Sequence, residues 1–488
     1  MHRRAFLHRA ALTATAASLS FSPRSRAAVS DAPLFISIEA NQAWDTTTSI
    51  DPHGHNAFSI YRESDIREVG SLRIAPFDAS EPGFNVRRLH ADGSAATIEF
   101  FDTYGEYLRV INGVDHRTVS HDIGPRNAFS GSLREGFPAI GALVAAVQGP
   151  RRPLAFVSTG GFDDTQGIVT LTRSGKQSVL RELARPNTTA GLSTNATYLP
   201  PSVEALVQRA QEARDARRSG ILASRRALPK ALRSHAALID ARAAEGGFLD
   251  LANILDASSS TSDSNQLISA AGLVLAAMRS DPAACTSAHL AFGNFDTHFD
   301  HDVLATGHRA RMRSLLEGIG HIIEEIENNP ANAALRARGV LIYVSSDFGR
   351  TAYNGGEDDE TGRGKDHWPV TSSMVIGLGA MKNKVGGGTV LGRTTPTVDG
   401  IAQPGLKAFP VRVDDNGNLV TADRLDAAGH FQLTATEVNA CLRQALHLDE
   451  EVPSPGTPKL VQRFALPEVE PAITATLAAG RNPLLKDT

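Results

Sequence analysis

The sequence is poor in cysteine and in long apolar runs, and each shortage excludes a class of protein. Its 488 residues include only 2 cysteines, Cys285 and Cys441. Two thiols cannot build a disulfide framework, so we expect two buried thiols, with a single bridge as the alternative. No run reaches the roughly 18 consecutive apolar residues that a membrane-spanning helix needs. The sequence therefore predicts no transmembrane anchor.

An excess of basic residues is also lacking. The chain has 49 Lys and Arg against 53 Asp and Glu, which gives a formal net charge of −4. Because nucleic-acid binding depends largely on basic side chains that neutralise phosphates, we expect no nucleic-acid partner. The hydrophobic fraction of 41% and the charged fraction of 21% are those of an ordinary globular protein, which excludes disordered, collagenous and coiled-coil chains.

The first 27 residues have the pattern of an export signal. Arg3 and Arg4 precede a weakly apolar stretch rich in Ala, Thr and Ser, which ends in small residues. This order is typical of a signal peptide, and the paired arginines indicate the twin-arginine route. We predict a signal at 1–27, recognition by the twin-arginine export machinery, and a periplasmic or secreted location. An amphipathic N-terminal helix of the folded domain is the alternative.

Residues 28–488 alternate short apolar strands with longer amphipathic helices. Helical periodicity over 140–147, 267–278 and 303–326 precedes three of the strands. Such alternation predicts a single α/β domain, a three-layer sandwich whose mainly parallel central sheet carries helices on both faces. The strands are expected at Leu34–Ile38, Leu154–Val157, His289–Phe292, Val340–Val344 and Met374–Ile376.

Two further segments depart from this alternation. Helical patterns at 202–218 and 232–244 predict a helical insertion, residues 203–245, packed on the sheet. The turn sequence Asp414–Gly417 lies between two short apolar runs, which predicts a small C-terminal β-hairpin.

Acidic and imidazole side chains gather in the loops next to the predicted strands, among them a long loop predicted at Asp347–Pro369. In open α/β sheets, ligands bind beyond the carboxyl ends of the strands. If the strands lie side by side, the loops meet at one edge, and three carboxylates with two imidazoles there suit a divalent cation, with Zn, Ca, Mg and Mn all open. The side chains expected to converge are Asp45, Asp296, His298, Asp347 and His367.

Three motifs in these loops resemble a large bacterial exported family, that of domain of unknown function 1501. They are Phe295-Asp-Thr-His298, Ser346-Asp-Phe-Gly-Arg-Thr351 and Gly364-Lys-Asp-His-Trp-Pro369, with weaker matches at Trp44-Asp45 and Ser120-His121. The family is similar to the alkaline phosphatase and sulfatase superfamily. The resemblance implies an alkaline-phosphatase-like fold and a metal-dependent hydrolase of phosphate or sulfate esters.

The same resemblance implies a role for single residues. It makes the five residues above metal ligands and Ser120 the nucleophile, with Thr118 as the second choice. Arg350 is expected either as a catalytic anion clamp or in a structural ion pair, and His121 as a hydrogen-bonded structural residue. The substrate would be a small-molecule or polysaccharide ester.

Two departures from the superfamily pattern limit these expectations. Phe348 stands where phosphatases of the superfamily have a second metal-binding histidine, which predicts a single cation or none. Neither cysteine lies in the Cys-Pro-Arg context of a formylglycine sulfatase. The alternative function is therefore a non-catalytic exported protein that keeps the fold for binding or assembly.

Overall fold

The fold is described from a computed structural model of the chain. The structure describes residues 32–485 apart from 55–57, 91, 151, 175–178, 180–181, 183–184, 186, 189–195, 225–228, 243–250, 252, 255–262, 281–282, 355–362 and 452–457. The predicted export signal at 1–27 lies outside the described residues.

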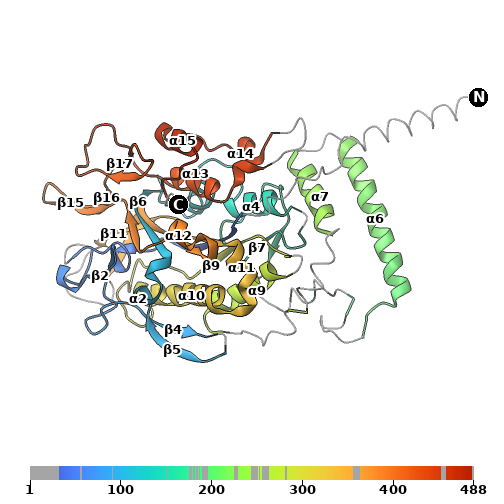
Figure 1. Ribbon diagram of the computed structural model, residues 1–488, viewed down its shortest axis with the longest axis horizontal. Helices are drawn as coiled ribbons and strands as arrows, with labels where there is room; N and C mark the ends of the chain where they lie inside the picture. The colour runs from blue at the N-terminus through green and yellow to red at the C-terminus, as the bar shows by residue number, and fades with distance from the viewer. Residues whose placement is uncertain are drawn as a thin grey trace, which may run out of the picture.

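A mixed, mostly parallel sheet lies at the centre of the described part of the chain (Figure 1). Neighbouring strands run parallel, except that β13 is antiparallel to both β10 and β6. In spatial order the eight strands are β14 (Thr389–Leu391), β6 (Leu108–Asp115), β13 (Val370–Leu378), β10 (Val340–Ser346), β1 (Leu34–Ala40), β9 (Ser287–Phe292), β7 (Phe156–Ser158) and β8 (Leu171–Arg173). The prediction of an α/β chain with a mainly parallel sheet is confirmed at this level.

The five predicted strands are consecutive in this order, from β13 to β7. Strand β13 runs opposite to β10, with Val344 paired to Met374 and Val340 to Leu378. Its first residues therefore lie at the edge where β10, β1 and β9 end. This reversal is why a segment that precedes β13 can meet segments that follow the parallel strands.

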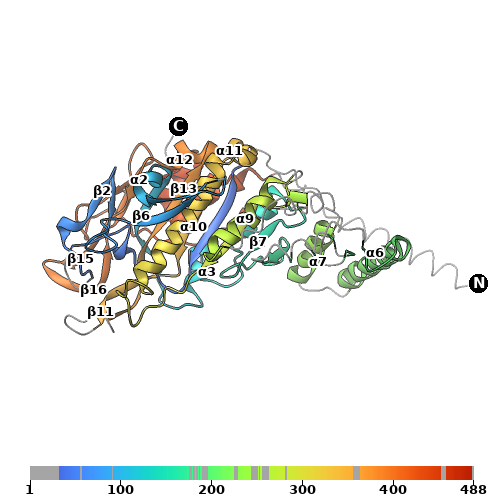
Figure 2. The same cartoon turned by 90° about the horizontal axis from the view of Figure 1, so that it is seen from below.

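Helices cover both faces of the sheet and complete three layers (Figures 1 and 2). On one face, Leu34, Ile36 and Ile38 of β1 pack in a core with α9 (Gln266–Arg279) and α10 (His308–Asn328). Phe35 points to the opposite core, formed with α4 (Ile140–Gln148) and α13 (Ala435–Ala445). A strand buried on both faces needs apolar residues at successive positions, which explains its continuous apolar run. The remaining helices near the sheet are α2 (Phe100–Tyr104), α3 (Gly124–Ser130), α11 (Ala333–Arg338), α12 (Lys382–Val385), α14 (Leu460–Arg463) and α15 (Pro471–Ala478).

A second, antiparallel sheet occupies much of the stretch 347–369, which the sequence predicts as a loop. Its order is β12 (Gly364–Trp368), β11 (Gly349–Asn354), β16 (Ile401–Ala408) and β15 (Thr394–Val398). Strands β11 and β12 pair so that Arg350 lies opposite His367. The loop prediction is wrong here because these strands are polar and pair with one another outside the main sheet, so no apolar run marks them.

Within the described ranges, three two-stranded hairpins lie outside these sheets. The predicted C-terminal hairpin is present as β17 (Val411–Val413) and β18 (Leu419–Thr421). The other two are β2 (Arg67–Val69) with β3 (Leu72–Ile74), and β4 (Asn85–Leu89) with β5 (Ala95–Glu99).

The predicted helical insertion is present as α6 (Pro201–Ser224) and α7 (Pro229–Arg242). Figure 1 shows α6 standing beyond the edge of the sheet, and its residues are exposed almost throughout, Leu206 to 61%. The expectation that the insertion packs on the sheet is therefore wrong for α6. A helix with charged and polar residues around most of its circumference has no apolar face to bury.

Both cysteines are free and buried, as expected. Cys285 lies in the core beside α9 and Cys441 in the core on the other face of the sheet, so the two cannot form a bridge. Burial raises the pKa of Cys285 to about 12. Among the helices that the structure describes, none is long and apolar enough to cross a bilayer.

Candidate metal centre

Four segments bring imidazoles and carboxylates together where β1, β9 and β10 end. His121 lies in the turn before α3, and Asp296 and His298 lie in the loop after β9. Asp347 directly follows β10, and His367 lies on β12. Four of the five predicted ligands thus meet at one edge of the sheet, together with His121.

The Nε2 atom of His367 lies close to the Nε2 atoms of two other histidines. His367 Nε2 lies 3.2 Å from His121 Nε2 and 3.1 Å from His298 Nε2. The carboxylate of Asp296 lies beside them, with Oδ1 3.1 Å from His298 Nε2 and 3.8 Å from His367 Nε2. These side chains are partly exposed, between 21% and 37%, so the cluster is open to solvent.

Hydrogen bonding alone does not satisfy this arrangement. A neutral imidazole carries one N–H, so the Nε2 atom of His367 can donate to only one of its two neighbours. A cation could instead accept lone pairs from the nitrogens and from a carboxylate oxygen. Ligand atoms at about 2.0–2.1 Å around a tetrahedral Zn²⁺ are separated by roughly 3.3 Å, close to the two spacings from His367. The ligand atoms of His121, Asp296 and His367 all lie within 4.8 Å of one another, so these three residues could hold a metal ion.

Asp347 acts behind His121 rather than in the cluster itself. Its Oδ2 lies 2.5 Å from His121 Nδ1, and the carboxylate is buried. A carboxylate on Nδ1 holds the N–H there and directs the Nε2 lone pair outward, as in carboxylate–histidine–metal arrangements. The hydrogen bond to Asp347 raises the pKa of His121. The ring of Phe348, buried at the position of the missing second histidine, packs against both His121 and His367 with centroids 4.8 Å away.

Arg350 anchors Asp296. Its side chain is 0% exposed, and Nη2 donates to Asp296 Oδ1 at 2.7 Å. The same guanidinium donates to the backbone carbonyls of Ala43 at 2.7 Å and Lys365 at 3.1 Å, and to two other carbonyls. Burial would raise the pKa of Asp296, but the hydrogen bond and charge of Arg350 outweigh it and lower the pKa. Arg350 is thus placed in the structural ion pair, with its donors turned to the protein rather than to an anion.

Gly364 allows β12, which carries His367, to lie close to the loop that carries His298. A Cβ on Gly364, at the start of β12, would collide with the carbonyl of His298. The backbone of β12 therefore lies directly against the His298 loop, three residues before His367. Any larger residue at this position would separate the two histidines.

A second set of candidate ligands overlaps the first. His298, Asp366 and His367 also place one ligand atom each within 4.8 Å of one another. Asp366 is the more exposed member at 59%, and its Oδ1 lies 3.9 Å from His298 Nδ1. The two sets share His367 and have three members each. We treat the set of His121, Asp296 and His367 as the centre, because all three of its members are partly buried whereas Asp366 is exposed.

Asp45 belongs to a separate buried network. Its Oδ2 lies 2.5 Å from Lys365 Nζ and 3.0 Å from His301 Nε2, and the carboxylate also accepts from Thr47 N–H. Burial would raise the pKa of Asp45, but the charge of Lys365, together with the hydrogen bond and charge of His301, outweighs it and holds the pKa well below its ordinary value. None of its contacts in the described structure is with the other four predicted ligands. Asp45 is placed as half of a buried ion pair.

Ser120 lies next to His121 but not in the wall of the cavity beside it. Its Oγ accepts from Asp122 N–H at 3.4 Å, and its carbonyl accepts from Gly124 N–H at the start of α3. The cavity beside the centre has a volume of about 450 Å³, and its wall includes His121 and Asp347.

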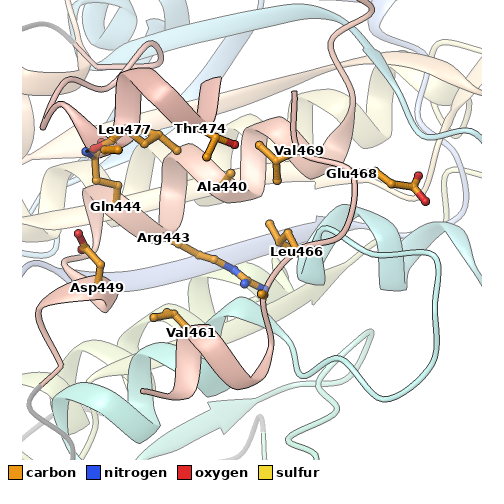
Figure 3. A pocket seen from close by; sticks show the side chains of 12 residues that line it. Ala440, Arg443, Gln444, Asp449, Val461, Leu466, Glu468, Val469, Thr474 and Leu477 are labelled. Atoms are coloured by element: carbon orange, nitrogen blue, oxygen red, sulfur yellow. Dashed lines mark hydrogen bonds between the residues drawn. The ribbon is translucent and has the colours of Figure 1, made fainter. Parts of the chain in front are cut away.

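A cavity of about 500 Å³ lies elsewhere, between α13, α14 and α15 (Figure 3). Figure 3 shows Arg443 extending from α13 across it toward Leu466. The guanidinium donates to the carbonyls of Phe464 and Ser130, at 2.7 and 3.1 Å. The candidate metal sets found among the described residues lie outside its lining, so we place the chemistry in the smaller cavity.

Sequence reasoning missed His121 as a ligand, although it noted the Ser120-His121 pair. A histidine shortly before a helix could have indicated a ligand position. None of the five predicted strands, however, comes directly before His121 in the sequence. Strand β6, which ends at Asp115 and leads to His121, was not among the predicted strands. Without that strand the turn had no place at the sheet edge.

A family model described as Protein of unknown function (DUF1501) matches residues 103–405. The match covers more than half of the 488 residues and contains His121, Asp296, His298, Asp347 and His367. Comparison with curated proteins gives no match. The resemblance seen in the three sequence motifs is confirmed for the family, and the chain belongs to the DUF1501 family.

Proposed function

We propose that this protein is an exported, metal-dependent hydrolase of phosphate or sulfate esters. The observation that carries the proposal is the set of His121, Asp296 and His367, whose ligand atoms all lie within 4.8 Å of one another beside a cavity of about 450 Å³. The Nε2 atom of His298 lies 3.1 Å from that of His367 and is the fourth candidate ligand. The similarity of the family's motifs to the alkaline phosphatase and sulfatase superfamily supports the ester-hydrolase class and an alkaline-phosphatase-like fold.

The ligand set favours zinc among the cations left open by the sequence. Imidazole ligands combined with a carboxylate are typical of Zn²⁺, whereas Ca²⁺ and Mg²⁺ prefer shells made of oxygen. Phe348 fills the place of a further histidine, which supports one cation rather than two. We therefore propose a single zinc ion per chain.

A bound cation supplies a Lewis acid that polarises the ester oxygen and activates water. The residues of the chain hold and orient that chemistry: Asp347 fixes the tautomer of His121, and Arg350 holds the carboxylate of Asp296. The likeness to phosphatases favours Ser120 as nucleophile, but Ser120 does not line the cavity. We propose that a water molecule attacks instead, and that Ser120→Ala retains turnover.

Elemental analysis of the purified protein, beside assays with phosphate and sulfate esters, tests the proposal. We expect one zinc per chain in the wild type, and loss of both metal and turnover in Asp296→Asn and His298→Ala. His430→Ala, which changes a surface histidine outside the cluster, is the matched control and should keep both. A wild type without metal and without turnover would contradict the hydrolase and favour the non-catalytic binding protein.

The contribution of the Asp347 carboxylate to metal affinity can be estimated. Removing a carboxylate that orients a metal-bound histidine lowers metal affinity by about 10–100-fold. Asp347→Asn should therefore weaken zinc binding by that factor without abolishing it, as measured by competition with a chromophoric chelator. An affinity equal to that of the wild type would remove Asp347 from the site.

A further inference from the structure

A buried carboxylate lies in the wall of the same cavity, apart from the proposed ligands. Glu39, near the end of β1, is 3% exposed and lines the cavity together with His121 and Asp347. Its Oε2 accepts from Phe162 N–H at 2.8 Å and lies 2.9 Å from His289 Nε2. Within the described residues Oε1 has no hydrogen-bond partner. One oxygen is thus held by the protein, and the other is available to a molecule in the cavity.

The pair of Glu39 and His289 is enclosed by a close backbone approach. His289 is 0% exposed, and its Nδ1 lies 2.8 Å from Ser37 Oγ. Gly161 covers the pair with φ +74, and a Cβ there would collide with the Glu39 carboxylate and lie 2.8 Å from His289 Nε2. Only glycine combines that backbone angle with that lack of space. The Glu39 carboxylate is therefore held in position by Phe162, His289 and Gly161.

The charge of the cavity indicates which part of an ester it can accept. Its lining includes the carboxylates of Glu39, Asp122 and Asp347, and no Lys or Arg is among the described residues that line it. A phosphate or sulfate group would be repelled there and fits only at the cation. The alcohol portion of the ester is uncharged, and its hydroxyls can donate to carboxylates. The alcohol portion therefore lies in the cavity, beside Glu39.

We propose that Glu39 is the proton-transfer residue of this hydrolase and that its substrates are esters of aliphatic alcohols. The inference rests on the proposed function. As the water oxygen forms its bond to phosphorus or sulfur, the bond from that atom to the alcohol oxygen breaks. Glu39 gives its proton to the departing oxygen, the attacking water releases one proton to the solvent on the opposite side and keeps its other hydrogen on the released acid, and Glu39 is reprotonated from solvent. Atoms and charge balance without any further reactant.

Aliphatic alcohols are poor leaving groups and need this proton, whereas 4-nitrophenol leaves without it. The test compares kcat/KM of the wild type and Glu39→Gln on 4-nitrophenyl and glycerol phosphates and on the corresponding sulfates. General acid–base catalysis contributes about 10²–10⁴-fold. We expect a loss of that size for the alkyl ester and a loss below about 10-fold for the nitrophenyl ester, with zinc content unchanged. Glu135→Gln, at a carboxylate that is 89% exposed and lies outside the cavity lining, is the control and should change neither rate selectively.

The possible outcomes separate this inference from the proposed function. An equal loss for both ester types, or loss of zinc in Glu39→Gln, would overturn the role of Glu39 while leaving the hydrolase intact. A wild type that binds no metal and cleaves neither ester would overturn the proposed function, and the inference with it. Should Glu39→Gln fail to fold, His289→Asn supplies the second variant. As a positioning residue, His289 should show the same selective loss for the alkyl ester with zinc retained, and a loss equal for both esters counts against the proposal.

Discussion

At the scale of single residues, His116 shows the cost of an imidazole without partners. It lies between β6 and α3, is 0% exposed, and within the described structure neither ring nitrogen has a hydrogen-bond partner. Burial lowers its pKa from an ordinary 6.5 to about 4. Because the folded state excludes the proton, the unfolded state takes up a proton first as the pH falls. Above about pH 6.5 this imidazole does not reduce the free energy of unfolding. As the pH falls from about 6.5 toward 4, protonation of His116 in the unfolded state progressively lowers that free energy.

We predict that His116→Phe removes this pH dependence. At pH 5 the proton taken up only by the unfolded state costs the wild type about 2 kcal/mol of unfolding free energy. The variant should therefore gain about 2 kcal/mol relative to the wild type between pH 7.5 and pH 5, measured by urea unfolding at each pH. His430→Phe, at a surface histidine, should give no such change. Parallel stability curves for His116→Phe and the wild type would show that the buried imidazole does not titrate in this window.

At the scale of elements, apolar content decided what could be predicted. Strands β1, β9, β10 and the central part of β13 are buried and read as continuous apolar runs, so the sequence located them to within two to four residues. The β11–β12 hairpin has polar residues and is held by pairing with its own neighbours, so no apolar run marks it. That hairpin nevertheless carries His367 and Arg350. Elements at the rim of the sheet, rather than in its core, therefore limited the prediction of the site.

The β12 contact with the His298 loop gives a prediction at this scale. Gly364→Ala would force a Cβ into the carbonyl of His298, and overpacking of this kind costs about 1–3 kcal/mol. We expect that loss in urea unfolding, together with reduced zinc content, since His298 and His367 would move apart. Gly220→Ala is the matched control, because nothing lies within 4 Å of a Cβ at this position of α6. Unchanged zinc in Gly364→Ala would mean that the cluster tolerates the shift.

At the scale of the whole molecule, the centre exists only in the folded chain. Its ligands come from residues as far apart as His121 and His367, on segments that meet through the order of β6, β13, β10, β1 and β9. The adjacency of the apolar strands let the sequence place Asp296, His298, Asp347 and His367 together. It could not exclude Asp45, because the ion pair with Lys365 depends on a side-chain direction that strand order does not specify. If the centre binds a metal, binding has to follow folding, and the predicted twin-arginine signal, which would export a folded protein, suits such a site.

The export signal predicted at 1–27 gives the last prediction. We expect Arg3→Lys combined with Arg4→Lys to retain the uncleaved precursor in the cytoplasm, because the twin-arginine route depends on the arginine pair. Arg9→Lys, a charge-conserving change outside the pair, should be exported normally. Cell fractionation with immunoblotting measures both, and normal processing of the double variant would contradict the twin-arginine signal. The retained precursor should still contain zinc, because the ligands of residues 121–367 fold without the signal. A retained precursor that is folded but free of metal would place metal loading after export.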